Sequence, residues 1–204
     1  MLFRSAYADK ESGPKRWIYR REWRQIAALE RRIGHDADIA SFVSDAEADL
    51  YRQLVPDAAA HVLGVSNGVD HAYFDPARDY PPVYDLGAPN FVFTGTMDYP
   101  PNVDAVTWFA TEILPIVRRT LPNARFHIVG HSPAESVRRL TSIEGVFVTG
   151  RVDDVRPYVA HATAAVAPMR IARGIQNKVL EAMSLGRPVV VTSGALEEIG
   201  RAHV

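Results

Sequence analysis

Several charged side chains with possible roles in anion binding occur together in the stretch APMRIARGIQNKVLEAM. Arg170, Arg173 and Lys178 supply positive charge, and the guanidinium fork of an arginine suits phosphate oxygens. A helix is expected from Gly174, and its first turn would offer free backbone N–H groups and a positive dipole end to a diphosphate. Glu181 would lie roughly 10 Å further along the axis, where it can accept hydrogen bonds from ribose hydroxyls. The same spacing fits an ordinary surface helix with a Lys178–Glu181 ion pair, so both interpretations stay open.

The elements that must position these residues alternate between strands and helices. Short β-prone runs end at Gly95, Gly130, Gly150 and Pro168. The expected strands are 91–93, 125–129, 146–148, 164–167 and 188–192. The expected helices run from Asn102 or Asp104 to 119, from 132, over 153–161 and over 174–185. Such alternation predicts an α/β fold, in which a Rossmann-like parallel sheet carries helices on both faces. Ligands bind outside the carboxyl ends of such strands, so the loops that follow them are the expected functional loops.

The first third of the chain is basic, with nine Lys/Arg against four Asp/Glu in residues 1–35. Tyr19, Trp23, Ile26 and Ile33 recur at helical spacing and predict one apolar helix face. The following elements are expected to be a strand over 39–43, a helix over 45–54 capped by Ser44 or Asp45, a strand over 61–65 and a turn over 67–70.

Composition excludes several classes of protein. A net charge of −1 argues against a nucleic-acid binder, and the absence of cysteine excludes disulfides, thiolate zinc sites and cysteine nucleophiles. His71 and His161 have no partner at metal-ligand spacing, and no apolar run is long enough to span a bilayer. The start of the chain does not resemble a signal peptide, so a cytoplasmic location is expected.

A series of short motifs resembles the nucleotide-binding signature of family 4 (group 1) glycosyltransferases, which have the two-domain GT-B architecture. In chain order the motifs are VSDAE from Val43, NGVD from Asn67, TGTM from Thr94, NVD from Asn102, TGRV from Thr149, GIQNKVLEAM from Gly174 and GRPVV from Gly186. The similarity is greatest to bacterial sugar transferases of exopolysaccharide and PEP-CTERM-type gene clusters.

The resemblance implies transfer of a sugar, with retained anomeric configuration, from a nucleotide-diphosphate donor to a saccharide or lipid-linked acceptor, without metal or cofactor. It places Gly95 and Thr96 beside the donor phosphates and Arg151 and Val152 at the base. It places Arg173, Gly174 and Ile175 at the diphosphate or donor sugar and Glu181 at the ribose. Because related enzymes use lipid-linked acceptors, Arg16, Arg20, Arg21 and Arg24 are expected either to contact anionic lipid or to form a solvated face.

The chain departs from the family pattern at two positions. Many members carry a glutamate where Arg173 stands, so no carboxylate role carries over to this position. Many also have an arginine and a lysine in the loop after Gly95, where the segment 97–101 supplies neither. Arg170, Arg173 or Lys178 is expected to take over that charge. His131 is interpreted as an exposed loop residue, and Asp153–Asp154 as a helix cap.

The expected organisation is a remnant of an acceptor-side domain over 1–75, a linker over 76–90, a truncated donor-binding domain over 91–197 and a non-native tail over 198–204. On this interpretation the N-terminal domain is incomplete, its catalytic groups are missing and the chain alone is inactive. Two alternatives remain: a GT-B nucleotide-sugar epimerase and a nucleotide-binding module without catalysis. Donor hydrolysis or transfer would separate an enzyme from a module, and sugar conversion without an acceptor would favour the epimerase.

Overall fold

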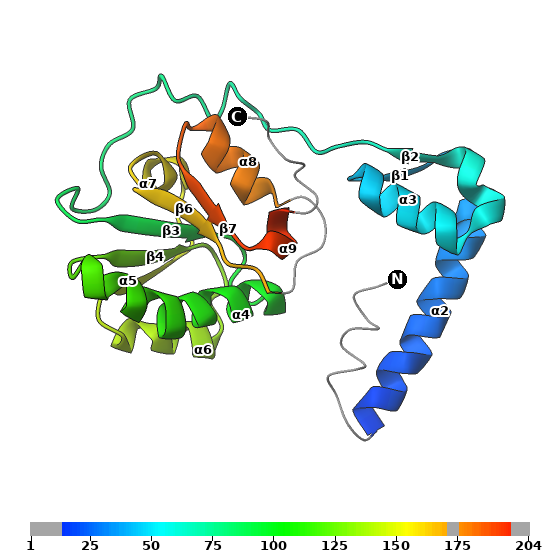
Figure 1. Ribbon diagram of the computed structural model, residues 1–204, viewed down its shortest axis with the longest axis horizontal. Coiled ribbons are helices and arrows are strands. Elements are labelled where there is room, and N and C mark those ends of the chain that lie inside the picture. Colours follow the sequence, from blue (N-terminus) through cyan, green and yellow to red (C-terminus); the bar gives the residue numbers. More distant parts are fainter. Residues whose placement is uncertain (1–13, 171–175, 197–204) are drawn as a thin grey trace. The chain divides into compact units, whose positions relative to one another are not determined.

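The computed structural model describes residues 14–170 and 176–196. The chain divides between Asn67 and Gly68 into a smaller unit 1 and a larger unit 2 (Figure 1). Residues 68–89 contain no helix or strand and belong to unit 2.

Within residues 14–67, unit 1 has two helices, a 3₁₀ turn and a pair of short parallel strands. These are α2 (Pro14–Asp36), β1 (Ala40–Phe42), α3 (Asp45–Leu54), η1 (Pro56–His61) and β2 (Val62–Gly64). Ser44 is the residue that caps α3, because its side chain accepts a hydrogen bond from the Glu47 backbone N–H at 3.2 Å.

The predicted apolar face of α2 is wrong at Ile33, which is 51% exposed. The contact face instead follows smaller residues. Ala27 is buried, and a Cβ on Gly34 would lie only 2.2 Å from the Tyr51 hydroxyl. That hydroxyl donates a hydrogen bond of 2.6 Å to the Glu30 carbonyl. A close approach of Tyr51 to the α2 backbone therefore rotates the helix away from the face that the large side chains predict.

Unit 2 is built on a parallel sheet with the strand order β5-β4-β3-β6-β7. The strands are β3 (Asn90–Thr94), β4 (Arg125–Val129), β5 (Val146–Gly150), β6 (Ala164–Ala167) and β7 (Val189–Val191). The bounds of β4 and β6 are those predicted from the sequence. The α/β fold class is thereby confirmed.

Helices cover both faces of this sheet (Figure 1). One face carries α4 (Pro100–Trp108), η2 (Phe109–Ile113), α5 (Leu114–Thr120), α6 (Glu135–Arg138) and η3 (Arg139–Ser142). The other face carries α7 (Arg156–Ala160) and α8 (Asn177–Ser184), and α9 (Ser193–Leu196) follows β7. Several predicted helix starts are corrected: α4 begins at Pro100 rather than 102 or 104, and α6 at Glu135 rather than 132. Helix α7 begins at Arg156 rather than 153, and α8 at Asn177 rather than 174.

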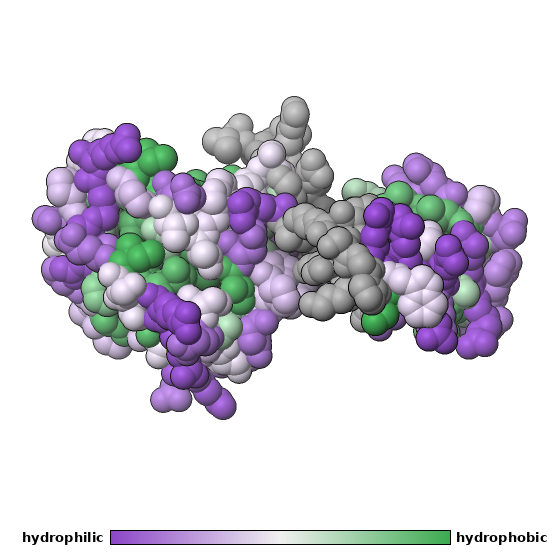
Figure 2. Space-filling model, turned by 90° about the horizontal axis from the view of Figure 1, so that it is seen from below, coloured by the Kyte–Doolittle hydropathy of each residue, from purple (hydrophilic) through white to green (hydrophobic). Residues whose placement is uncertain are grey.

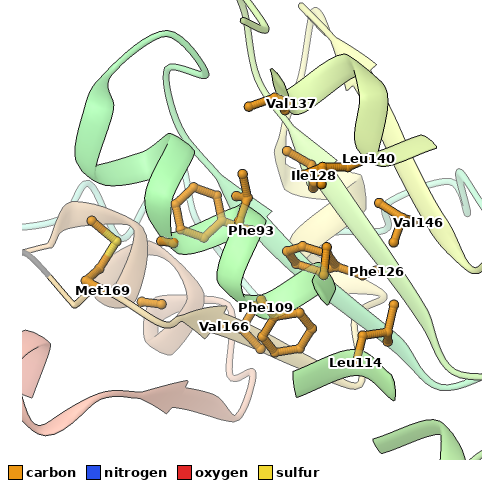
Figure 3. Close-up of a cluster of buried hydrophobic side chains, with 14 of the residues drawn as sticks. Phe93, Phe109, Leu114, Phe126, Ile128, Val137, Leu140, Val146, Val166 and Met169 are labelled. Atoms are coloured by element: carbon orange, nitrogen blue, oxygen red, sulfur yellow. The ribbon is translucent and has the colours of Figure 1, made fainter. Parts of the chain in front are cut away.

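Successive strand residues supply the cores on the two faces, because side chains alternate along a strand. Phe93 belongs to the cluster under α4 to α6, whereas Val92 belongs to the cluster under α7 and α8. In the first cluster the rings of Phe109 and Phe126 lie side by side, 4.4 Å apart (Figure 3).

The segment before β3 is attached to the sheet by its aromatic residues. The Tyr84 ring stacks on buried His127 at 4.3 Å, and the Tyr84 hydroxyl donates a 2.5 Å hydrogen bond to the Tyr158 carbonyl. Asn90, which is 1% exposed, accepts a hydrogen bond from His127 Nε2 at 2.8 Å. Burial, with a smaller contribution from Arg125, lowers the pKa of His127 to about 4, so the ring is neutral at pH 7.

The strand order reverses at β3, which has β4 on one side and β6 on the other. The connections after β3 and β6 therefore leave the sheet toward opposite faces. Ligands of doubly wound sheets bind at this switch point, outside the carboxyl ends of the strands.

Candidate functional site

At the carboxyl edge of the sheet, Gly95 and Gly130 continue the hydrogen bonding beyond β3 and β4, and Gly150 is the last residue of β5. The Gly95 N–H donates to the Val129 carbonyl at 3.1 Å, and the Gly130 N–H donates to the Gly150 carbonyl at 3.2 Å. Gly130 has a φ of +152°, and a Cβ on it would lie 1.7 Å from the Gly95 carbonyl oxygen. The first two loops thus touch through their backbones, an approach that only glycine permits.

Thr96 and His131 connect these two loops through their side chains. Thr96 Oγ1 is 3.1 Å from His131 Nε2, and His131 Nδ1 is 3.1 Å from Ser132 Oγ. His131 is exposed, as expected, but it is tied to Thr96 rather than being an isolated loop residue. Ser132 has a φ of +55°, and such left-handed residues other than glycine are concentrated at functional sites.

Asn102 joins the loop after β3 to helix α8. It lies in the first turn of α4 and is 7% exposed. Its Nδ2 donates to the Thr96 carbonyl at 3.0 Å, and its Oδ1 accepts from Lys178 Nζ at 3.0 Å. The Lys178 ammonium also lies 4.1 Å from the centre of the Phe93 ring. A cation is therefore held at the point where the strand order reverses.

Burial shapes the charges on α8. It lowers the pKa of Lys178 to about 8, opposed by the nearby Glu181 carboxylate, and it raises the pKa of Glu181, opposed by Lys178. With a pKa of about 8 the lysine remains charged at pH 7. Within the described ranges, Lys178 forms no ion pair with Glu181 closer than 4.0 Å. The Lys178–Glu181 ion pair that the spacing also allowed is therefore wrong, and the hydrogen bond of Lys178 goes to Asn102.

Arg170, at the start of the loop after β6, is held by a residue of α4. Its guanidinium forms a two-bonded ion pair with Asp104, in which Nε donates to Oδ2 at 3.0 Å. The guanidinium also lies 5.3 Å from the Trp108 ring centre. Half of the Arg170 side chain is exposed, so it occupies the site's border rather than its interior.

Arg151 and Val152 follow β5, the second strand away from β3. With about 4.8 Å between neighbouring strands, they lie roughly 10 Å from the loop of Thr96. Arg151 is exposed, whereas Val152 packs partly on the core under α7. Next to them, Asp154 accepts a 2.9 Å hydrogen bond from the Arg156 N–H, and bonding to Arg156 lowers the Asp154 pKa. The predicted cap at Asp153–Asp154 is corrected, because the residue that directly precedes α7 is Val155, which makes no side-chain capping bond.

The structure therefore brings together Gly95, Thr96 and Lys178, with Arg170 and Arg151–Val152 on separate sides of them. Arg173, Gly174 and Ile175 lie outside the described residues. A cavity of about 10 Å³ beneath Lys178 is too small for a nucleotide. A larger hollow of about 330 Å³ is distant from the predicted site residues. It is lined by Arg118 and Glu144, which form an ion pair with each other.

Sequence reasoning missed two residues of this site, Asn102 and Asp104. Both were noted only as part of the NVD motif and as the start of a helix. An amide in the first turn of a helix, one turn beyond a glycine loop, was the available signal. Its bond to Lys178 spans 76 residues of sequence and has no local signature.

The family profile described as "Glycosyl transferases group 1" matches residues 88–203, more than half of the chain. No curated protein matches in sequence.

Solved structures with a similar fold have low sequence identity. WaaG, a glycosyltransferase involved in lipopolysaccharide biosynthesis, has a TM-score of 0.67 at 16% identity, over 94% of this chain and 55% of its own. Sucrose-phosphate synthase from Thermosynechococcus elongatus has a TM-score of 0.61 at 19% identity, over 84% and 45%. Anabaena HepE, in complex with UDP and glucose, has a TM-score of 0.55 at 16% identity, over 79% and 46%.

The chain spans about half the length of these structures, which share the GT-B architecture. Together with the sheet and its glycine-ended strands, the profile match establishes the family: the chain belongs to the group 1 glycosyl transferases.

Proposed function

We propose that the chain carries the donor site of a retaining glycosyltransferase of family 4. Such an enzyme moves a sugar from a nucleotide-diphosphate donor to a saccharide or lipid-linked acceptor, in polysaccharide or glycoconjugate biosynthesis. The observation that carries the proposal is the Lys178 ammonium, held 3.0 Å from Asn102 beside the Thr96 loop at the switch point of the sheet. The order of the sequence motifs supports the retaining reaction and the likeness to exopolysaccharide enzymes.

In this proposal the diphosphate lies between the loop of Gly95 and Thr96 and the start of α8. Lys178, Arg170 and Arg173 surround it with positive charge, and Gly174 and Ile175 contact it through the backbone. Arg151 and Val152 hold the base, and Glu181 accepts the ribose hydroxyls. Negative charge builds up on the diphosphate as it leaves the sugar, and cations fixed in advance stabilise that charge. The loop 97–101 supplies no basic residue, and in this proposal Lys178 provides the positive charge from α8 instead. The proposal includes neither a metal nor a cofactor.

Calorimetric titration of the chain with UDP-glucose tests the proposal, since the structurally similar HepE binds UDP. We expect binding, and an approximately tenfold loss of affinity in Lys178→Met. Arg119→Met, a change to an exposed cation by the distant hollow, is the matched control and should bind normally. Equal affinity in the two variants would contradict the role of Lys178. We expect the isolated chain to bind the donor without transferring its sugar; conversion of the sugar without acceptor would indicate an epimerase.

We propose separately that α2 contacts the inner face of an anionic membrane. Its exposed side chains include Arg16, Arg20, Arg21 and Arg24, and Trp17 is 67% exposed beside them. Hydrophilic residues cover much of the visible face of unit 1 (Figure 2). In the described ranges no helix is long and apolar enough to cross a membrane.

Co-sedimentation with phosphatidylglycerol vesicles tests this contact, with phosphatidylcholine vesicles as the uncharged control. We expect binding to the anionic vesicles only, and its loss when Arg20 and Arg24 are changed to glutamine. If the chain co-sediments equally with the two kinds of vesicle, the arginine side chains of α2 form a solvated face and do not bind anionic lipid.

A further inference from the structure

We propose that Asn102 is a positioning residue of the donor site, whose amide fixes the Lys178 ammonium relative to the Thr96 backbone that receives the diphosphate. This inference rests on the donor-binding role proposed above. Nothing in the family match or in the similar structures assigns such a role to Asn102.

The two hydrogen bonds of the Asn102 side chain require a group that both donates and accepts. Lys178 can only donate hydrogen bonds and the Thr96 carbonyl can only accept them, so the group between them must accept at one end and donate at the other. A carboxamide does both, and the two partners fix which end is Oδ1 and which is Nδ2. An aspartate would place an acceptor against the Thr96 carbonyl, and a leucine would satisfy neither partner.

The Asn102 side chain is also buried. Asn102 is 7% exposed, so water cannot readily replace its amide if that amide is removed. The loop also packs directly on it, because a Cβ on Gly95 would lie 2.8 Å from Asn102 Nδ2. The amide thus serves as the contact surface of the loop and as the anchor of the lysine.

The Asn102 amide adds no charge beside Lys178. Lysine has a long flexible side chain, and here the Phe93 ring lies on one side of the ammonium while Asn102 Oδ1 accepts from it. Because the amide is neutral, it orients the ammonium without cancelling its charge. The carboxylate Asp104, two residues later, is instead bonded to Arg170. Neither Asn102 nor Asp104 therefore neutralises Lys178. The carboxylate that acts on its charge is Glu181, one turn further along α8.

A double-mutant cycle on the whole chain tests the proposal, with UDP-glucose affinity at pH 7 as the readout. We expect Asn102→Ser and Lys178→Met each to weaken binding about tenfold, and the double variant to be within about twofold of Lys178→Met alone. Losses that multiply in the double variant would overturn the proposal, because Asn102 would then act independently of the lysine. If Lys178→Met binds normally, the donor role of the lysine fails instead, and the Asn102 proposal fails with it.

Asn102→Asp provides a readout that a purely structural role would not affect. The new carboxylate would raise the pKa of Lys178, so the pH above which UDP-glucose affinity falls should move upward while the affinity at pH 7 drops at least tenfold. Asn123→Asp is the control: it adds the same charge at an exposed asparagine just before β4, and should leave the affinity within twofold. An unchanged pH profile in Asn102→Asp, or an equal loss in Asn123→Asp, would refute the positioning role.

Inorganic pyrophosphate serves as a probe without a base, so a preference for another nucleotide does not block the test. Folding of each variant is checked by near-ultraviolet circular dichroism, and Asn102→Ser stands in if Asn102→Asp does not fold. A wild-type chain that binds neither UDP-glucose nor pyrophosphate would overturn the proposed function, and this inference with it.

Discussion

Replacing Gly130 by alanine should damage unit 2 more than an ordinary change of glycine to alanine. The added Cβ would lie 1.7 Å from the carbonyl oxygen of Gly95 and 2.8 Å from its carbonyl carbon. Both neighbours are backbone atoms, so no side chain can rotate away to make room. The loops after β3 and β4 must therefore move apart, and the hydrogen bond from Gly95 N–H to the Val129 carbonyl is strained or lost.

The cost follows from two separate effects. A residue with a side chain at a φ of +152° is strained by about 1–3 kcal/mol, and the overlap with Gly95 adds overpacking of about 1–3 kcal/mol. Together they give on the order of 4 kcal/mol. For a chain of this size that loss corresponds to a Tm lower by roughly 8–16 °C.

Gly186→Ala is the matched control, because it isolates the conformational effect. Gly186 also has a positive φ, +66°, but the nearest atom to an added Cβ is Pro76 Cβ at an ordinary 3.9 Å. We expect a cost of about 1 kcal/mol, or roughly 2–4 °C. Thermal unfolding followed by circular dichroism measures both variants. If Gly130→Ala melts within 2 °C of Gly186→Ala, the backbone contact between the two loops is not a structural constraint and the reasoning is wrong.

Three further predictions concern charge. His127 binds its proton near pH 4 in the folded chain but near 6.5 when unfolded, so the free energy of unfolding should decrease as the pH falls between these values, by no more than about 3 kcal/mol. Denaturant titrations at pH 7 and pH 4 measure the free energy of unfolding, and His127→Phe should remove much of the difference between the two values. If that variant loses as much stability between pH 7 and pH 4 as the wild-type chain, groups other than His127 cause the effect. Lys178 loses its charge near pH 8, so UDP-glucose affinity should decrease as the pH rises through 8, and a flat profile would contradict its contact with the diphosphate. Arg170 must leave Asp104 to reach a phosphate, so Asp104→Asn should raise UDP-glucose affinity a few-fold and Arg170→Gln should lower it; no change in either would place Arg170 outside the donor site.

Local sequence signals were sufficient for most of the sheet. The bounds of β4 and β6 were predicted because glycine or proline follows each β-prone run. The sequence predicted that either Ser44 or Asp45 caps α3, because serine and aspartate are chemically similar caps. The hydrogen bond from the Glu47 N–H identifies Ser44 as the cap. Gly95 and Thr96 were predicted at the carboxyl edge because they directly follow a β-prone run in an alternating pattern of strands and helices.

Features that depend on distant contacts were not predictable in this way. The helix expected over 102–119 contains a π-helical turn, Phe109–Ile113, because Pro115 has no N–H with which to continue the regular α-helical bonding. The exposure of Ile33 depends on how closely Tyr51 approaches Gly34. The bonding of Asn102 to Lys178 joins residues on different helices, and spacing within one helix suggested Glu181 as the partner instead.

The hydrogen bonds that continue past β3 and β4 also have an entropic consequence. The amides of Gly95 and Gly130 are bonded before any ligand arrives, so the backbone of these loops has already lost its conformational freedom during folding. Ordering a residue costs about 1–2 kcal/mol, and a ligand that binds here does not have to supply that amount again for these two positions. Slow exchange of both amide hydrogens with solvent, in the ligand-free chain, would be the direct sign of this early ordering.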